Sequence, residues 1–229
     1  MERYILWDFD GTLATRGGMW SGVLLAVLSR FEPSLECELS TLRPHMQTGF
    51  PWHSPEQGHE HLGTADQWWE ALLPIFQRAF QAAGLSNTRA LALSREVRTA
   101  YLDPPGWTVF DDVVPALVTL HAAGWRHVIL SNHVPELTHL TETLGLRQHF
   151  DEVFSSATIG YEKPHELAFR RTLDQLGNPR DVWMVGDNFN ADIVGARRVG
   201  VPAVLVRSTH DEAQYQAQSL SQLAQVIAA

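Results

Sequence analysis

Two aspartates lie two residues apart near the start of the chain, directly after a short apolar segment. The apolar residues 4–7 are followed by Asp8, Phe9, Asp10 and Gly11. This pattern predicts a buried β-strand that ends at the acids, and side chains alternate along a strand, so Asp8 and Asp10 should project to the same side. Two adjacent carboxylates repel each other, so the pair predicts either a bound hard metal ion or two very different pKa values. Taken alone, the residues would also suit a simple turn.

The composition is that of an ordinary globular protein. The chain has 229 residues, 45% of them hydrophobic and 19% charged, which is enough for one core with a smaller accessory domain. A formal net charge of -9 argues against nucleic acid as the main partner. Cys37 is the single cysteine, so no intrachain disulfide can form. The first strand begins at once and no apolar run is long enough to span a membrane, so we expect a cytoplasmic protein without a membrane partner. The sequence does not indicate an oligomeric state.

The elements that must position the acids alternate regularly in the second half of the chain. Apolar, β-branched runs that end in polar residues predict strands, and amphipathic segments closed by glycine predict helices. The predicted strands cover 126–130, 152–155, 182–185 and 203–206; the predicted helices cover 111–123, 135–144, 164–176 and 191–199. Such alternation predicts an α/β fold with a doubly wound parallel sheet and helices on both faces.

A helical insertion separates the first strand from this alternating region. Residues 14–18 are polar and glycine-containing, which predicts a hinge or mobile flap. Helices are predicted over 20–31, 64–83 and 89–101, the second one opened by a capping box of Thr64 and Gln67, and residues 33–63 are predicted to be irregular. We therefore expect a catalytic core formed by 1–15 and 102–229 and a second domain, the helical insertion, formed by 16–101.

Two features of the insertion have no assigned role. Four histidines, at 45, 53, 59 and 61, cluster near Trp52 in the irregular part. They could form a transition-metal site, a solvated loop or a lid that faces the substrate. Trp68 and Trp69 are adjacent on a predicted helix, so we expect that they do not both face the core and that one lines a cleft or a partner surface.

Polar residues follow three of the predicted core strands. Asp8 and Asp10 follow the first strand, Ser131 and Asn132 follow the second, and Asp187 follows a later one. In parallel α/β sheets, ligands bind beyond the carboxyl ends of the strands where the strand order reverses. These residues should therefore meet at one edge of the sheet.

The motifs together resemble those of the haloacid dehalogenase-like (HAD) hydrolase superfamily, most of whose members are phosphatases. All four of its motifs are present in order: Asp8 to Leu13, Ser131-Asn132, Lys163-Pro164, and Gly186 to Asp192. The resemblance implies a Rossmann-like core, and the helical insertion resembles the superfamily's C1-type cap. One departure is that residues 14–18 replace the x-Asp-Ser found in many relatives that carry a cap.

The resemblance also implies a role for each matching residue. It implies that Asp8 is the nucleophile that forms an aspartyl-phosphate, and that Asp10 is the general acid and then the base. It implies Mg²⁺ bound by Asp8, Asp187 and the backbone carbonyl of Asp10, an oxygen-only set that suits this ion. The remaining matches are phosphate-binding residues (Ser131, Asn132 and Lys163) and supporting residues (Gly11, Thr12 and Asp192). Asp192 should hold a metal-bound water or Lys163, although an acid there also suits the first turn of a helix. Without the other motifs, Lys163 would be predicted to be a solvated lysine before a proline that begins a helix.

These residues predict a phosphatase of a small phosphorylated metabolite, and three rival functions use a similar site. A phosphomutase would use the same groups. A dehalogenase would share Asp8 but would need no proton donor at Asp10, and a binding module should have lost at least one of the key residues. Phosphoglycolate, a sugar phosphate and a nucleotide monophosphate are all open as substrates.

Overall fold

A parallel sheet forms the centre of the protein. The computed structural model describes residues 2–227. Its main sheet has six strands in the order β5-β4-β1-β6-β7-β8, and every neighbouring pair is parallel. The predicted α/β class with a parallel sheet is confirmed. The strands of this sheet are β1 (Arg3–Trp7), β4 (Trp125–Ser131), β5 (Glu152–Ser155), β6 (Asp181–Gly186), β7 (Ala203–Val206) and β8 (Tyr215–Ala217).

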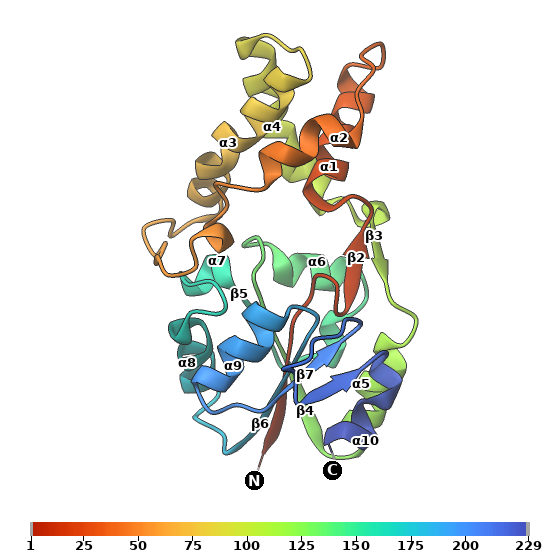
Figure 1. The fold of residues 1–229 in the computed structure, drawn as a ribbon, viewed down its shortest axis with the longest axis vertical. Helices are drawn as coiled ribbons and strands as arrows, with labels where there is room; N and C mark the ends of the chain where they lie inside the picture. The colour runs from red at the N-terminus through yellow and green to blue at the C-terminus, as the bar shows by residue number, and fades with distance from the viewer. Residues whose placement is uncertain (1, 228–229) are drawn as a thin grey trace.

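Helices cover both faces of this sheet because β1 alternates its buried side chains between them. Ile5 and Trp7 belong to the apolar cluster that includes α5, α6 and α10. Tyr4 and Leu6 belong to the cluster that includes α8 and α9. Figure 1 shows α8 and α9 on one flank of the sheet and α5 and α10 on the other. The core helices are α5 (Val113–Ala122), α6 (Leu137–Thr143), α7 (Ser156–Ile159), α8 (Glu166–Gln175), α9 (Gly195–Arg198) and α10 (Leu223–Ile227).

The last predicted helix, 191–199, differs from the expectation. A π-helical turn over Phe189–Val194 precedes the single turn of α9. The Asn188 side chain accepts hydrogen bonds from the backbone N–H groups of Asn190 and Ala191, at 3.0 and 2.9 Å, and so caps a turn that begins two residues earlier than predicted.

The helical insertion stands above the carboxyl edge of the sheet, and both chain ends lie at the opposite side (Figure 1). The capping box forms: Gln67 N donates to Thr64 Oγ1 at 3.2 Å, and Thr64 N donates to Gln67 Oε1 at 3.1 Å. Short helical turns interrupt the otherwise irregular residues 33–63. The helices of the insertion are α1 (Met19–Phe31), α2 (Leu39–Leu42), α3 (Ala65–Ala82) and α4 (Asn87–Leu102). Among residues 2–227, no helix combines the length and apolar character needed to cross a membrane.

A two-stranded ribbon joins the insertion to the core, where the sequence predicted a flap. Strand β2 (Ala14–Arg16) pairs antiparallel with β3 (Trp107–Val109). Arg16 explains why this segment forms a strand: the residue is only 8% exposed, and its guanidinium donates to the backbone carbonyls of Ala100 and Tyr101 at 2.8 and 3.1 Å. Arg16, one of the polar residues that suggested mobility, therefore links the segment that enters the insertion to the segment that leaves it.

The expectation for Trp68 and Trp69 is wrong, because both are buried. Trp68 is fully buried and Trp69 is 5% exposed. Helix α3 packs against α4 and also against α2 and the 3₁₀ turn Arg43–Met46, so two of its faces are covered. Trp69 Nε1 donates to the Glu136 carboxylate of the core at 3.1 Å, so this ring does lie between insertion and core.

Candidate active site

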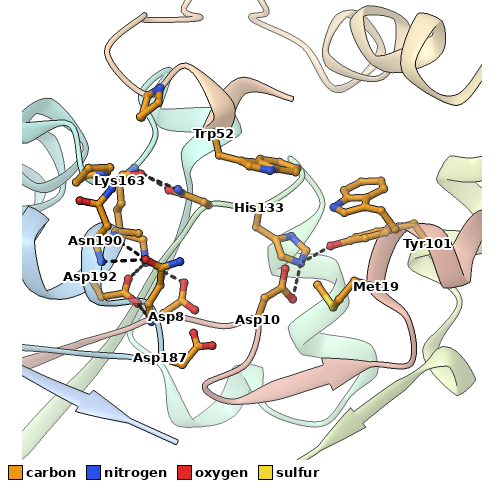
Figure 2. A pocket seen from close by; sticks show the side chains of 16 residues that line it. Asp8, Asp10, Met19, Trp52, Tyr101, His133, Lys163, Asp187, Asn190 and Asp192 are labelled. Atoms are coloured by element: carbon orange, nitrogen blue, oxygen red, sulfur yellow. Dashed lines mark hydrogen bonds and ion pairs between the residues drawn. The ribbon is translucent and has the colours of Figure 1, made fainter. Parts of the chain in front are cut away.

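Asp8 lies at the carboxyl end of the central strand, and several donors hold its carboxylate. Its backbone N–H donates to the carbonyl of Val185 at 2.9 Å, which fixes the end of β1 against β6. Its Oδ1 accepts hydrogen bonds from Ser131 Oγ at 2.9 Å and from Lys163 Nζ at 2.8 Å. Its Oδ2 receives one long contact, from Thr12 Oγ1 at 3.4 Å. One oxygen of Asp8 is therefore held and the other is left available to react (Figure 2).

Lys163 is the only lysine in the sequence, and it is 2% exposed. Its ammonium lies between two carboxylates, 2.8 Å from Asp8 Oδ1 and 2.6 Å from Asp192 Oδ1. Burial alone would lower the pKa of the ammonium, but Asp192 and Asp8 outweigh burial and raise this pKa above its ordinary value. Lys163 is therefore a permanent cation inside the site.

Asn132 orients the segment that carries Lys163. The amide Nδ2 of Asn132 donates to the carbonyl of Lys163 at 2.8 Å, and the backbone N–H of Lys163 donates to Asn132 Oδ1 at 2.7 Å. This paired contact joins the end of β4 to the loop before α8 and engages the side chain of Asn132. The Ser131 hydroxyl is likewise engaged with Asp8.

Asp187 and Asp192 complete an acidic cluster with Asp8. One carboxylate oxygen from each of the three lies within 4.8 Å of the others. Burial, and then the repulsion of Asp8 and Asp192, raises the pKa of Asp187 to about 7. Two glycines make room for the cluster, because a Cβ at Gly11 would lie 2.3 Å from Asp187 Oδ2 and a Cβ at Gly186 would lie 2.1 Å from Asp192 Oδ2.

Asp10 has a different environment, although it lines the same cavity as Asp8. Among the described residues, no group donates a hydrogen bond to its buried Oδ1. Burial, and then the charges of Asp8 and Asp187, raise the pKa of Asp10 well above its ordinary value. The two aspartates of the opening motif therefore differ: Asp8 is held by donors, and Asp10 has a raised pKa.

The sequence that carries this arrangement matches a known family. The family model of haloacid dehalogenase-like hydrolases matches residues 2–200. The chain belongs to this family. The resemblance inferred from the motifs and the prediction of a hydrolase are confirmed.

Individual HAD-like hydrolases are similar over different parts of the chain. The human haloacid dehalogenase-like hydrolase domain-containing protein 3 is 31% identical over 89% of this chain and 81% of its own length. Glyceraldehyde 3-phosphate phosphatase from Methanothermobacter thermautotrophicus is 36% identical over 46% of this chain and 47% of its own length. The structure of the HAD-hydrolase YfnB from Bacillus subtilis bound to magnesium has a TM-score of 0.74 over 99% of this chain and 98% of its own, at 18% identity. The last likeness shows the fold.

Two residues that the sequence did not indicate lie beside Asp10 of this HAD-like hydrolase. His133 Nε2 is 3.8 Å from Asp10 Oδ1 and 3.2 Å from the hydroxyl of Tyr101, which comes from the end of α4 (Figure 2). Burial lowers the pKa of His133 to about 4, so the imidazole is neutral. The position of His133 directly after Ser131 and Asn132, at a strand end, could have indicated it; nothing in the sequence indicated Tyr101.

The cavity above these groups has a volume of about 340 Å³ and two unlike walls. The core wall carries the charged and amide side chains described above. The insertion wall is formed by Met19, Trp20, Trp52, Pro55 and Tyr101. Trp20 stacks on Tyr101 with ring centroids 4.3 Å apart, so this wall is braced by its own rings. Of the clustered histidines, His59 is buried 3.0 Å from Glu162, and the acidic cluster is the sole set of three or more metal-ligating side chains found within residues 2–227.

Proposed function

We propose that this HAD-like hydrolase is a Mg²⁺-dependent phosphatase that cleaves a small phosphate monoester through an aspartyl-phosphate on Asp8. The observation that carries the proposal is the contrast between Asp8, whose carboxylate is fixed by Ser131 and Lys163, and Asp10, whose raised pKa favours the protonated form. A carboxylate nucleophile beside a protonated acid is the pair that phosphoryl transfer to an enzyme requires. The phosphatase similar to part of this chain supports the same class of reaction.

In the first half of the reaction, Asp8 replaces the alcohol on phosphorus. The free Oδ2 of Asp8 forms a bond to phosphorus while the bond from phosphorus to the alcohol oxygen breaks. Asp10 gives its proton to the departing oxygen, so a neutral alcohol leaves. Lys163 and Ser131 stabilise the charge that develops between Asp8 and the phosphoryl group, because both donors already point at this carboxylate.

In the second half, water releases the phosphate. Asp10, now ionised, lines the same cavity and takes a proton from the attacking water. The new oxygen–phosphorus bond forms as the Asp8–phosphorus bond breaks, which regenerates the Asp8 carboxylate. The helical insertion, residues 16–101, would act as the cap that limits further access of water to the cavity.

The acidic cluster fits Mg²⁺. Its donors are all oxygens. Burial, and then the charges of Asp8 and Asp192, raise the pKa of Asp187, and a bound cation would relieve that repulsion. Asp8, Asp187 and the backbone carbonyl of Asp10 would hold the ion, and Asp192, which is bonded to Lys163, would support the site. When bound, Mg²⁺ neutralises charge on the transferring phosphoryl group.

The decisive experiment is an assay of inorganic phosphate released from para-nitrophenyl phosphate, with Mg²⁺ and with a chelator. We expect turnover with Mg²⁺, loss of turnover with the chelator, and loss of turnover in Asp8→Asn. Asp181→Asn is the matched control, because Asp181 begins β6 at the opposite edge of the sheet. Metal-independent release, or full activity of Asp8→Asn, would contradict the mechanism. Transfer of the phosphoryl group within a substrate without release of phosphate would show a phosphomutase instead.

A further inference from the structure

The insertion wall of the cavity offers a leaving group no positive charge. Of the described residues that line the cavity, four are aspartates, at 8, 10, 187 and 192, and one is a lysine. That lysine is already shared between Asp8 and Asp192. The insertion wall contributes rings, a thioether and a proline.

The nearby arginines are engaged elsewhere. Arg16 donates to backbone carbonyls at the start of the insertion. Arg98 pairs with Asp66 and with Glu136, each at 2.6 Å. Arg170 and Arg198 line an adjoining hollow that shares Pro55, Pro164 and Asn190 with the cavity, but neither arginine lines the cavity itself. A carboxylate on a leaving group would therefore find no cationic partner on the insertion wall.

The aromatic part of the insertion wall is a fixed platform. Trp52 is partly exposed and stacks on Phe50 with ring centroids 4.5 Å apart at 13°. Trp20 lies 5.9 Å from Trp52 and is stacked with it at 30°. Figure 2 shows Trp52 above the gap between the Asp8 cluster and His133, so it lies where a leaving group would extend. Rings held in this way bind flat or apolar groups with little loss of conformational entropy.

We propose that the preferred substrates are phosphate monoesters whose leaving group carries no negative charge and has a flat, apolar face that packs on Trp52. The proposal rests on the phosphatase function above and narrows its substrate class. It disfavours monoesters with a carboxylate close to the phosphate, of which phosphoglycolate is one, because no cation on the insertion wall would offset the cost of removing that charge from water.

A pair of benzyl phosphates tests the charge. The para-carboxybenzyl and para-carbamoylbenzyl esters have nearly the same size, and the methylene group insulates the leaving oxygen from the substituent. We expect kcat/KM for the carbamoyl ester to exceed that for the carboxyl ester by about tenfold or more, which corresponds to about 1.4 kcal/mol. Equal values would overturn the proposal.

A substitution that adds a cation should reverse this preference. Pro55→Lys places an ammonium on the insertion wall without removing a stacked ring, and Pro55→Gln changes the same backbone position without a charge. We expect the lysine variant to reduce the ratio of the two esters by about tenfold and the glutamine variant to leave the ratio as it is. If Arg198→Gln abolishes turnover of the carboxyl ester, the carboxylate of the leaving group binds Arg198 in the adjoining hollow, and the proposal is overturned.

Benzyl and ethyl phosphate test the ring, since their alcohols are similarly poor leaving groups. We expect Trp52→Ala to reduce kcat/KM for benzyl phosphate by about tenfold, largely through KM, and to leave ethyl phosphate nearly unaffected. Trp52→Phe should restore most of the loss. Equal effects on both substrates would overturn the role of Trp52. If para-nitrophenyl phosphate is hydrolysed with Mg²⁺ while these preferences are absent, the inference alone fails; if no ester is hydrolysed, the phosphatase function fails and the inference fails with it.

Discussion

The two walls of the cavity are built in opposite ways. On the core wall, charged side chains project from the ends of parallel strands, and donors at 2.6 to 2.9 Å fix Asp8 and Asp192. On the insertion wall, neutral side chains come from the helices and short turns of the insertion and are braced by stacking on each other. Under the proposed mechanism, the difference separates two tasks: the core fixes the reacting groups, and the insertion faces the part of the substrate that leaves.

The comparison predicts that core substitutions act on every substrate, while insertion substitutions act on some. Asp10 is an exception: it belongs to the core, but because it protonates the leaving oxygen, its substitution should affect some substrates more than others. We expect Asp10→Asn to lower kcat by about 10²–10⁴-fold for alkyl esters, because the departing alkoxide then lacks a proton. The loss should be much smaller for para-nitrophenyl phosphate, whose leaving group needs none.

A series of substituted phenyl and benzyl phosphates measures this effect, as the slope of log kcat against the pKa of the leaving alcohol. Asp181→Asn is again the control, because Asp181 begins β6 at the opposite edge of the sheet. An equal loss for all leaving groups would show that Asp10 does not act as the acid.

The largest stability effect should come from the single lysine. Lys163→Met leaves Asp8 and Asp192 buried without their shared cation. We expect the free energy of unfolding to fall by about 3–5 kcal/mol, measured by urea titration in the presence of a chelator. Lys163→Arg keeps the charge and should lose less. A methionine variant as stable as the parent protein would show that the buried charges are not coupled.

Removal of metal should make stability depend on pH in an unusual direction. Asp187 has a pKa of about 7 in the folded chain and an ordinary pKa of about 4 when unfolded, so the folded state binds the proton more tightly. Without metal, stability should therefore fall as the pH rises from about 4 to about 7, by up to roughly 4 kcal/mol from this group, and then level off. Mg²⁺ should oppose the loss, and so should stabilise more at high pH than at low pH.

Thermal unfolding at about pH 5 and about pH 8, with chelator and with Mg²⁺, tests this linkage. Asp187→Asn is the matched variant, because it removes the titrating group with little change in volume. The difference between the parent and this variant reports on Asp187 together with its influence on Asp10, whose pKa the charge of Asp187 raises. A parent protein whose stability in chelator rises over this range as steeply as that of the variant would contradict the prediction.

The core wall could be predicted from the sequence, and the insertion wall could not. Apolar runs bounded by polar residues and glycines marked the strands, and β5 and β7 have the predicted bounds. Parallel pairing then brings the strand ends together by geometry, so residues as distant as Asp8 and Asp187 were assigned to one edge. Strand β8 was missed because it is short and holds a polar residue, Gln216.

The cavity residues that the sequence did not indicate are positioned by tertiary contacts. Trp20, Trp52 and Tyr101 are far apart in the sequence, and no spacing rule brings them to one cavity. The error at Trp68 and Trp69 has the same origin: a helix has one buried face only if one side is covered, and α3 is covered on two. His133 is the intermediate case, since its strand end was predicted and its contact with Tyr101 was not.

The smallest predicted effect tests whether polar pairs outside the cavity matter as those inside do. Arg98 joins Asp66 of the insertion to Glu136 of the core, but its side chain is 36% exposed and that of Asp66 is 85% exposed. Solvent screens such pairs, so Arg98→Gln should lower the free energy of unfolding by less than about 1 kcal/mol. Arg95→Gln, an exposed position on the same helix, is the control, and urea titration at low and high salt is the measurement. A loss for Arg98→Gln as large as that for Lys163→Met would mean that the junction between insertion and core, rather than the buried lysine, provides the main electrostatic support of the site.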